Sequence, residues 1–245
     1  PTRFPQGLAH TIDMLKQDYG VRYVGVWQAF QGYWGGVDPD SDAFKERRYM
    51  FETLPGGMTV PSAQPAWDMF VDGECLSEYG CERFWWRWSE ELANAGVDFV
   101  KVDSQSTMSV LTRGAQSYGT LLMRHRAVDL AASAFFNNAL INCMGMAPEN
   151  IWNRRRSPIS RCSDDFLPEN REWFTKHVLQ CAYNSLLQGV FYWCDWDMWW
   201  TDDEQAKKNS LCRAVSGGPI YISDMIGRTN PEILRPLILS DGHIL

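Results

Sequence analysis

Acidic side chains close several of the apolar segments in this 245-residue chain. A single acidic end is unremarkable. A series of them in one chain is not, because like charges brought together cost free energy unless they serve a ligand, a cation or a proton transfer. The polar residues at these ends are Lys101 and Asp103, then Arg161, Ser163, Asp164 and Asp165, then Asp195 and Asp197, and finally Ser223 and Asp224.

Two chemistries that use such residues find little support in the sequence. A set of Asp ligands could hold Mg²⁺, but no metal-ligand motif is present, and three of the four His fall on expected helices: His10, His125 and His177. We therefore expect no metal and no cofactor. A Schiff-base lysine at Lys101 is disfavoured because Asp103, two residues later, would keep the amine protonated if it lies close.

A third chemistry, the cleavage of glycosidic bonds, fits better. It needs two carboxyl groups, one as nucleophile or base and one as general acid. The chain also carries twelve Trp, whose flat faces and single N–H suit sugar ligands. The alternative is that the acids cap helices, since Asp is a good N-cap residue. Taken singly, Asp165 and Asp224 fit capping, whereas Asp103 and Asp164 fit a function.

The elements expected to position these residues alternate along the chain. The apolar spacing and turn residues predict a parallel sheet, and polar strand ends favour a TIM-type (β/α)8 barrel over a doubly wound fold. A Gly-, Pro- and aromatic-rich segment, 28–74, is expected to be a long functional connection. Strands are predicted at 21–27, 97–103, 139–143, 158–165, 190–197 and 219–224, and helices at 7–19, 78–95, 113–136, 170–188, 203–215 and 231–239.

The amino-acid composition indicates the number of domains, the kinds of partner that are disfavoured and the redox environment. With 45% hydrophobic residues the chain can build one sizeable core, so we expect a single domain spanning 1–245. A net charge of −7 disfavours nucleic acid, and the sequence has no apolar run long enough for a membrane span. The seven Cys include no paired metal-type spacing and read as free buried thiols, which indicates a reducing, cytoplasmic location.

Six ordered motifs resemble one family of carbohydrate-active enzymes. They are YVGVWQAFQGYWGGV (23–37), GVDFVKVDSQ (96–105), INCM (141–144), SRCSDDF (160–166), DWDMW (195–199) and GGPIYISD (217–224). Together they resemble glycoside hydrolase family 36, in the branch of raffinose synthases, seed imbibition proteins and alkaline α-galactosidases. The resemblance implies a (β/α)8 barrel of which this chain holds about six β/α units, without the first two barrel strands and an N-terminal β-domain.

The resemblance also implies roles for individual residues. Asp103 would be the nucleophile of a retaining mechanism on α-galactosides and Asp164 the acid/base, with Asp165 as the fallback. Trp27, Trp34 and Trp196 would line the sugar pocket. The further substrate contacts expected are Lys101, Cys143, Arg161, Asp165 and Asp195.

The expected partner is therefore an oligosaccharide or another galactoside. Water as the acceptor makes the enzyme a hydrolase, which is the first expectation. A sugar hydroxyl makes it a galactosyltransferase of the raffinose synthase kind. A barrel that binds carbohydrate without turnover is the third possibility.

Overall fold

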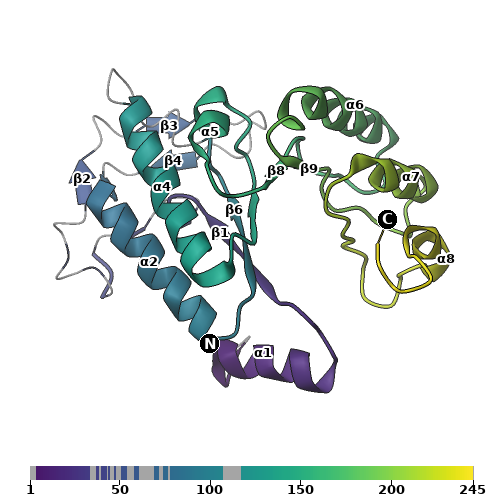
Figure 1. Ribbon diagram of the computed structural model, residues 1–245, viewed down its shortest axis with the longest axis horizontal. Coiled ribbons are helices and arrows are strands. Elements are labelled where there is room, and N and C mark those ends of the chain that lie inside the picture. Colours follow the sequence, from purple (N-terminus) through teal and green to yellow (C-terminus); the bar gives the residue numbers. More distant parts are fainter. Residues whose placement is uncertain are drawn as a thin grey trace. The chain divides into compact units, whose positions relative to one another are not determined.

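The computed structural model describes residues 4–33, 37–38, 40–42, 44, 47, 51–53, 58–60, 69–71, 74–76, 78–106 and 117–244. The chain divides into two compact units, Pro1–Ser157 and Pro158–Leu245 (Figure 1). Each unit combines parallel strands with helices, as the alternating sequence pattern predicts.

Three parallel strands form the sheet of the first unit. They are β1 (Gly25–Ala29), β6 (Phe99–Asp103) and β7 (Leu140–Asn142), with β6 in the middle. In this register Trp27 lies beside Lys101, and Ala29 lies beside Asp103. Successive side chains of a strand point to opposite faces, so Trp27, Lys101 and Asp103 share one face of the sheet.

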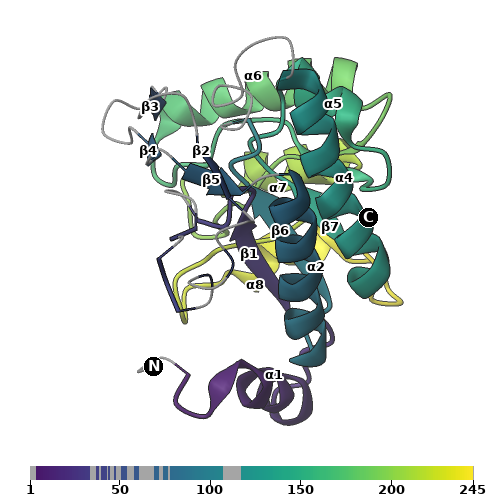
Figure 2. The same ribbon diagram turned by 90° about the vertical axis from the view of Figure 1, so that its left-hand side faces the viewer.

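The opposite face of this sheet is covered by helices. Helices α2 (Glu78–Asn94) and α4 (Ser117–Phe136) run side by side against the strands in both ribbon views (Figures 1 and 2). Along β6 every second residue is buried, which places Val100 and Val102 in the core and leaves Lys101 and Asp103 on the other side. Each large apolar side chain buried here contributes roughly 1.5–3 kcal/mol. The core includes Trp85, Val100, Val102, Leu121, Ala131 and Leu140.

Helix α1 (Gly7–Asp18) is attached to this sheet by a half-buried ion pair. The ammonium group of Lys16 lies 2.8 Å from Asp98 Oδ2 and also donates to the carbonyl of Gly96 at 2.8 Å. Partial burial opposes ionisation of Asp98, but the hydrogen bonds from Lys16 and from Val24 N–H outweigh it and lower the pKa of this carboxyl. The charge pair thus fixes α1 to the start of β6.

The segment 28–74, predicted as one long connection, contains short strands of its own. β2 (Phe51–Thr53) pairs antiparallel with β5 (Glu74–Leu76), and β3 (Met58–Val60) pairs antiparallel with β4 (Met69–Val71). The prediction missed them because three-residue strands are too short for a period of two to show. Trp34 and residues 35–36 lie outside the described residues.

The second unit is built on two further parallel strands, β8 (Ile159–Arg161) and β9 (Trp193–Asp195). Between them runs α6 (Arg171–Gln188), whose N-cap Asn170 accepts a hydrogen bond from Trp173 N–H at 2.9 Å. Helices α7 (Ala206–Ser216) and α8 (Pro231–Leu234) follow, the latter continued by a 3₁₀ turn at Arg235–Leu237. Among the described residues, no helix has the length and apolar character needed to cross a membrane.

One predicted strand does not form. The segment 219–224 makes only an isolated parallel bridge, between Ile222 and Trp199. Its first residue is Pro219, which has no N–H to donate to a ladder. Before it, Gly218 packs directly on the carbonyl of Cys194, the middle residue of β9. The extended segment therefore follows the residues after β9 instead of pairing with the strand itself.

Candidate functional site

The carboxylate of Asp103 is held by two N–H donors at the end of β6. Oδ2 accepts from the indole Nε1 of Trp27 at 3.0 Å, and Oδ1 accepts from the backbone N–H of Ser104 at 2.7 Å. Ser104 is fully buried with a left-handed φ of 62°, and its hydroxyl accepts from Gln31 Nε2 at 3.0 Å. The turn after β6 thus fixes the direction of the carboxylate.

An aromatic surface lies beside this carboxylate. Trp27 is 39% exposed, and its ring meets that of Tyr33 edge to face, with centroids 6.4 Å apart. Lys101 is the cross-strand neighbour of Trp27. An exposed indole beside a cation and a carboxylate can stack on a sugar and contact its hydroxyl groups. The structure therefore brings together three of the predicted site residues, Trp27, Lys101 and Asp103.

The end of β7 is more deeply buried. Cys143 is 2% exposed, and its backbone N–H donates to the carbonyl of Val102 at 2.9 Å. Gln105, which the sequence reasoning did not select, donates through Nε2 to Asn142 Oδ1 at 2.8 Å and to the carbonyl of Val102 at 3.0 Å. It ties the turn after β6 to β7. The predicted contact of Cys143 with substrate stays a prediction.

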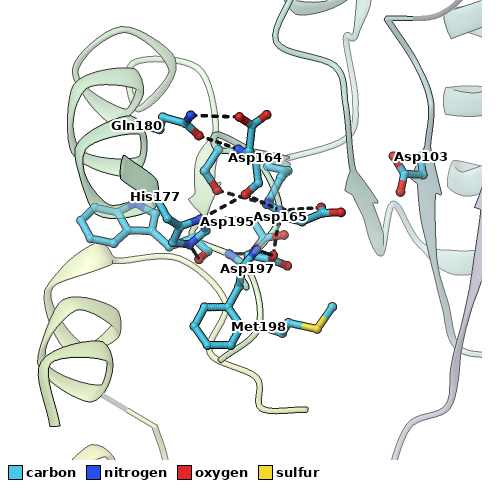
Figure 3. Close-up of polar contacts among 12 residues, drawn as sticks. Asp103, Asp164, Asp165, His177, Gln180, Asp195, Asp197 and Met198 are labelled. Atoms are coloured by element: carbon cyan, nitrogen blue, oxygen red, sulfur yellow. Dashed lines mark hydrogen bonds and ion pairs between the residues drawn. The ribbon is translucent and has the colours of Figure 1, made fainter. Parts of the chain in front are cut away.

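In the second unit, Arg161 is the centre of a polar network, drawn in Figure 3. Its side chain is 1% exposed, and Nη2 lies 2.7 Å from Asp197 Oδ2 and 3.0 Å from Asp165 Oδ1. The same nitrogen donates to the backbone carbonyl of Asp164 at 2.7 Å. Residues 161–166, here called the acid loop, therefore wrap around the guanidinium group.

Helix α6 holds the acid loop from the other side. Gln180 Nε2 donates to Asp164 Oδ2 at 3.0 Å, and Gln180 Oε1 accepts from the backbone N–H of Asp164 at 2.8 Å (Figure 3). One turn earlier, the Nδ1 atom of His177 lies 3.1 Å from the carbonyl of Asp164. Residues three apart on a helix share a face. Gln180 was missed, and only its spacing from His177 could have suggested it.

One further carboxylate, that of Asp195, and the phenol of Tyr221 complete the network. The hydroxyl of Tyr221 donates to Asp195 Oδ2 at 2.9 Å and to Asp197 Oδ1 at 3.2 Å. Burial raises the pKa of Tyr221 far above its usual range, and the charges of the two carboxylates raise it further. Tyr221 therefore stays a phenol and a donor. Sequence reasoning did not select it, although it lies in the predicted strand 219–224.

Trp196 and Asp224, the other residues singled out in the sequence, make hydrogen bonds inside the second unit. Trp196 is buried against Cys162, Cys181 and Cys194, and its Nε1 donates to Ser185 on α6 at 3.0 Å. Its predicted contact with sugar stays a prediction. Asp224 accepts from both N–H and hydroxyl of Thr201, each at 2.6 Å. The predicted capping of the following helix is not seen, because the N-cap residue of α8 is Asn230 and the partner of Asp224 precedes it in the chain.

The cysteines whose side chains the structure describes form no disulfide, as predicted: Cys81, Cys143, Cys162, Cys181, Cys194 and Cys212. Within the cluster around Cys162, the pKa values of neighbouring thiols are shifted in opposite directions. Hydrogen bonds to the two neighbouring sulfurs raise the pKa of Cys162, whereas its thiol lowers the pKa of Cys181 to about 5 against the effect of burial. His177, with Nε2 3.7 Å from the sulfur of Cys181, lowers that pKa further. No group of three or more His, Cys, Asp or Glu able to hold a metal occurs among the described residues.

Comparison with known proteins identifies the family of the chain. A family model described as "Raffinose synthase or seed imbibition protein Sip1" matches residues 3–245. The chain belongs to this family. The resemblance to the raffinose synthase branch of glycoside hydrolase family 36 is thereby confirmed.

Curated relatives carry transferase names. The chain is 36% identical, over 98% of its length, to "Probable galactinol--sucrose galactosyltransferase 6" of Arabidopsis thaliana, and covers 32% of that protein. It is 31% identical to "Galactinol--sucrose galactosyltransferase" of Pisum sativum, with 98% and 32% of the two chains covered. With "Stachyose synthase" of Pisum sativum the identity is 27% and the coverage 96% and 29%. The chain thus spans about a third of the length of these relatives.

A solved structure shows the fold. The GH27 β-L-arabinopyranosidase of Geobacillus stearothermophilus matches with a TM-score of 0.56 at 15% identity, over 95% of this chain and 56% of that one. The predicted fold class is confirmed: an α/β chain with parallel strands that forms part of a (β/α)8 barrel.

Proposed function

We propose that the protein transfers α-galactosyl groups by a retaining, double-displacement mechanism, with Asp103 as nucleophile and Asp164 as acid/base. Asp103 attacks the anomeric carbon while Asp164 gives its proton to the departing glycosidic oxygen. The resulting galactosyl ester of Asp103 is then attacked by an acceptor hydroxyl, whose proton returns to Asp164. Family membership supports the chemistry.

The observation that carries the proposal is the fixed carboxylate of Asp103. Each of its oxygens accepts an N–H, from Trp27 at 3.0 Å and from Ser104 at 2.7 Å, at the carboxyl end of a barrel strand. Active sites of (β/α)8 barrels are built at that end. A nucleophile oriented before substrate binds contributes by removing the entropy cost of alignment.

Asp164 suits the acid/base role better than Asp165. The carboxylate of Asp165 pairs with the guanidinium of Arg161 at 3.0 Å, an arrangement that uses its ionised form. The carboxyl group of Asp164 instead accepts a hydrogen bond from a neutral donor, the side-chain amide of Gln180, at 3.0 Å. A neutral partner on one oxygen leaves the other oxygen able to carry or accept a proton. This difference supports Asp164, and not Asp165, as the group proposed to exchange the proton.

The acceptor decides between two activities that share the first step. The names of the relatives support a sugar acceptor, so galactinol as donor and sucrose as acceptor are the first pair to test. Hydrolysis, with water as acceptor, is the second candidate because the covalent intermediate is the same. This order reverses the expectation drawn from the sequence, where hydrolysis came first.

The test uses the full-length protein and its Asp103→Ala, Asp164→Ala and Asp165→Ala variants. We expect Asp103→Ala to lower the rate by about 10³-fold or more, whereas Asp165→Ala keeps an acid/base and loses less. Free galactose and the transfer product are measured together, which separates the two acceptors. Azide added to Asp103→Gly should give a β-galactosyl azide. Full activity in Asp103→Ala would remove the nucleophile from the proposal.

A further inference from the structure

A single carboxylate oxygen of Asp197 holds both ends of the acid loop. Asp197 Oδ2 lies 2.7 Å from Arg161 Nη2, at the start of the loop, and accepts from the backbone N–H of Phe166, at its end, also at 2.7 Å. Figure 3 shows Asp197 on the side of the loop away from Gln180. We propose that Asp197 is a positioning residue for Asp164. The inference rests on the proposed function of Asp164.

The contact between Asp197 and Asp164 runs through one nitrogen atom. Arg161 Nη2 donates both to Asp197 Oδ2 and to the carbonyl of Asp164, each at 2.7 Å. The guanidinium group is planar, so fixing one of its nitrogens on Asp197 also fixes where the carbonyl of Asp164 must lie. Asp197 thus acts on the backbone of Asp164, while Gln180 acts on its carboxyl group.

Asp197 itself has no freedom to turn. Its second oxygen accepts from the hydroxyl of Tyr221 at 3.2 Å, and its own N–H donates to Asp195 Oδ1 at 2.8 Å. Its backbone is left-handed, with a φ of 66°, a conformation that non-glycine residues adopt at a cost. Both carboxylate oxygens and the backbone are therefore committed to one arrangement.

The burial of the Arg161–Asp197 ion pair also favours a positioning role over a stabilising one. The side chains of Arg161 and Asp197 are each 1% exposed. A buried ion pair is weak evidence for stabilisation, because desolvation of the two charges offsets their attraction. What the pair does supply is a fixed geometry for the loop. A displacement of about 1 Å at a reacting group can cost about 10²-fold in rate.

A change in the leaving group separates positioning from general destabilisation. A sugar leaving group needs the proton of Asp164, whereas dinitrophenolate departs without it. In the full-length protein, Asp197→Asn should therefore lower kcat/KM for a sugar α-galactoside at least about 10-fold more than for dinitrophenyl α-galactoside. Asp164→Ala should show the same pattern more strongly. Azide should raise kcat of Asp197→Asn on the dinitrophenyl substrate, since it replaces an acceptor that needs a base.

Asp224→Asn is the matched control. It makes the same substitution at a carboxylate of the same unit that binds Thr201 with two 2.6 Å hydrogen bonds and does not touch the acid loop. It should lower kcat/KM for both substrates alike, if at all. Urea midpoints of both variants show how much stability each has lost.

The outcomes separate the two proposals. A parent protein inactive on both substrates overturns the proposed function. An active parent in which Asp197→Asn loses both activities equally overturns the positioning role alone. If Asp197→Asn does not fold, Tyr221→Phe decides, because it keeps the ring and removes only the hydroxyl that donates to the second oxygen of Asp197 and to Asp195. We expect a smaller effect of the same kind, and equal losses on both substrates would again reject the role.

Discussion

Acidification should weaken the first unit through His125. This ring is 2% exposed on α4, lies against Phe30 with centroids 4.7 Å apart, and bonds through Nε2 to Asn150 Oδ1 at 2.8 Å. Burial lowers the pKa of His125 to about 4, and the charge of Arg154 lowers it further, against the hydrogen bond of Asn150. Folding therefore requires the neutral ring.

The size of the effect follows from the two pKa values. The unfolded chain takes up a proton near pH 6.5 and the folded chain near pH 4, so stability is complete above pH 6.5 and falls as the pH drops between these values. With 1.36 kcal/mol for each unit, the loss from this group is about 1.4 kcal/mol at pH 5.5 and about 2.5 kcal/mol at pH 4.5.

The assay is urea unfolding of the full chain, followed by tryptophan fluorescence at pH 7.5 and pH 5.5. His125→Gln can still donate to Asn150 but does not titrate, so its stability should fall less over this interval, by about 1.4 kcal/mol, than that of the parent. Other groups that titrate affect both proteins and cancel in the difference. Parallel losses in parent and variant would refute the reasoning, because His125 would then not be the group that takes up the proton.

Two further changes test the packing that holds the elements in place. Lys16→Met removes the donor to Asp98 and should lower the free energy of unfolding by about 1 kcal/mol, measured by urea midpoint; an unchanged midpoint would show that α1 does not depend on this pair. Gly218→Ala would place a Cβ in overlap with the carbonyl oxygen of Cys194, so the backbone must shift, at a cost of about 2 kcal/mol or more. Its control is Gly217→Ala, at φ 68° with no atom within 4 Å, which should cost only about 1 kcal/mol; equal thermal midpoints would contradict the close approach.

The strand ends were predictable because two local rules govern them. An apolar strand buries alternate residues, and parallel strands gather their carboxyl ends at one edge, which is enough to select Asp103 and Arg161. The same rules placed the longer helices to within a few residues of their observed bounds within the described chain, but missed the short helix α5 (Pro148–Asn153). Family resemblance then added roles that spacing alone left open.

Contacts between residues far apart in the sequence could not be predicted from these local rules. Gln180 binds Asp164 from a helix sixteen residues later, and Tyr221 reaches Asp195 from a segment that was expected to be a paired strand. Neither residue type is unusual in its own stretch of sequence. Only the packing of α6 against β8, and of the segment after α7 against β9, brings these side chains to the network.

Left-handed backbone occurs within two residues of the ends of three strands: at Ser104 after β6, at Met144 after β7 and at Asp197 after β9. Each such residue costs about 1 kcal/mol relative to ordinary backbone. The consequence is a trade-off for protein engineering. Glycine at these positions would be the usual route to relieve the strain, yet it would loosen the turns that aim Asp103 and the acid loop. Thermostabilised variants of this family should therefore gain from changes in the helices and leave these three turns unchanged.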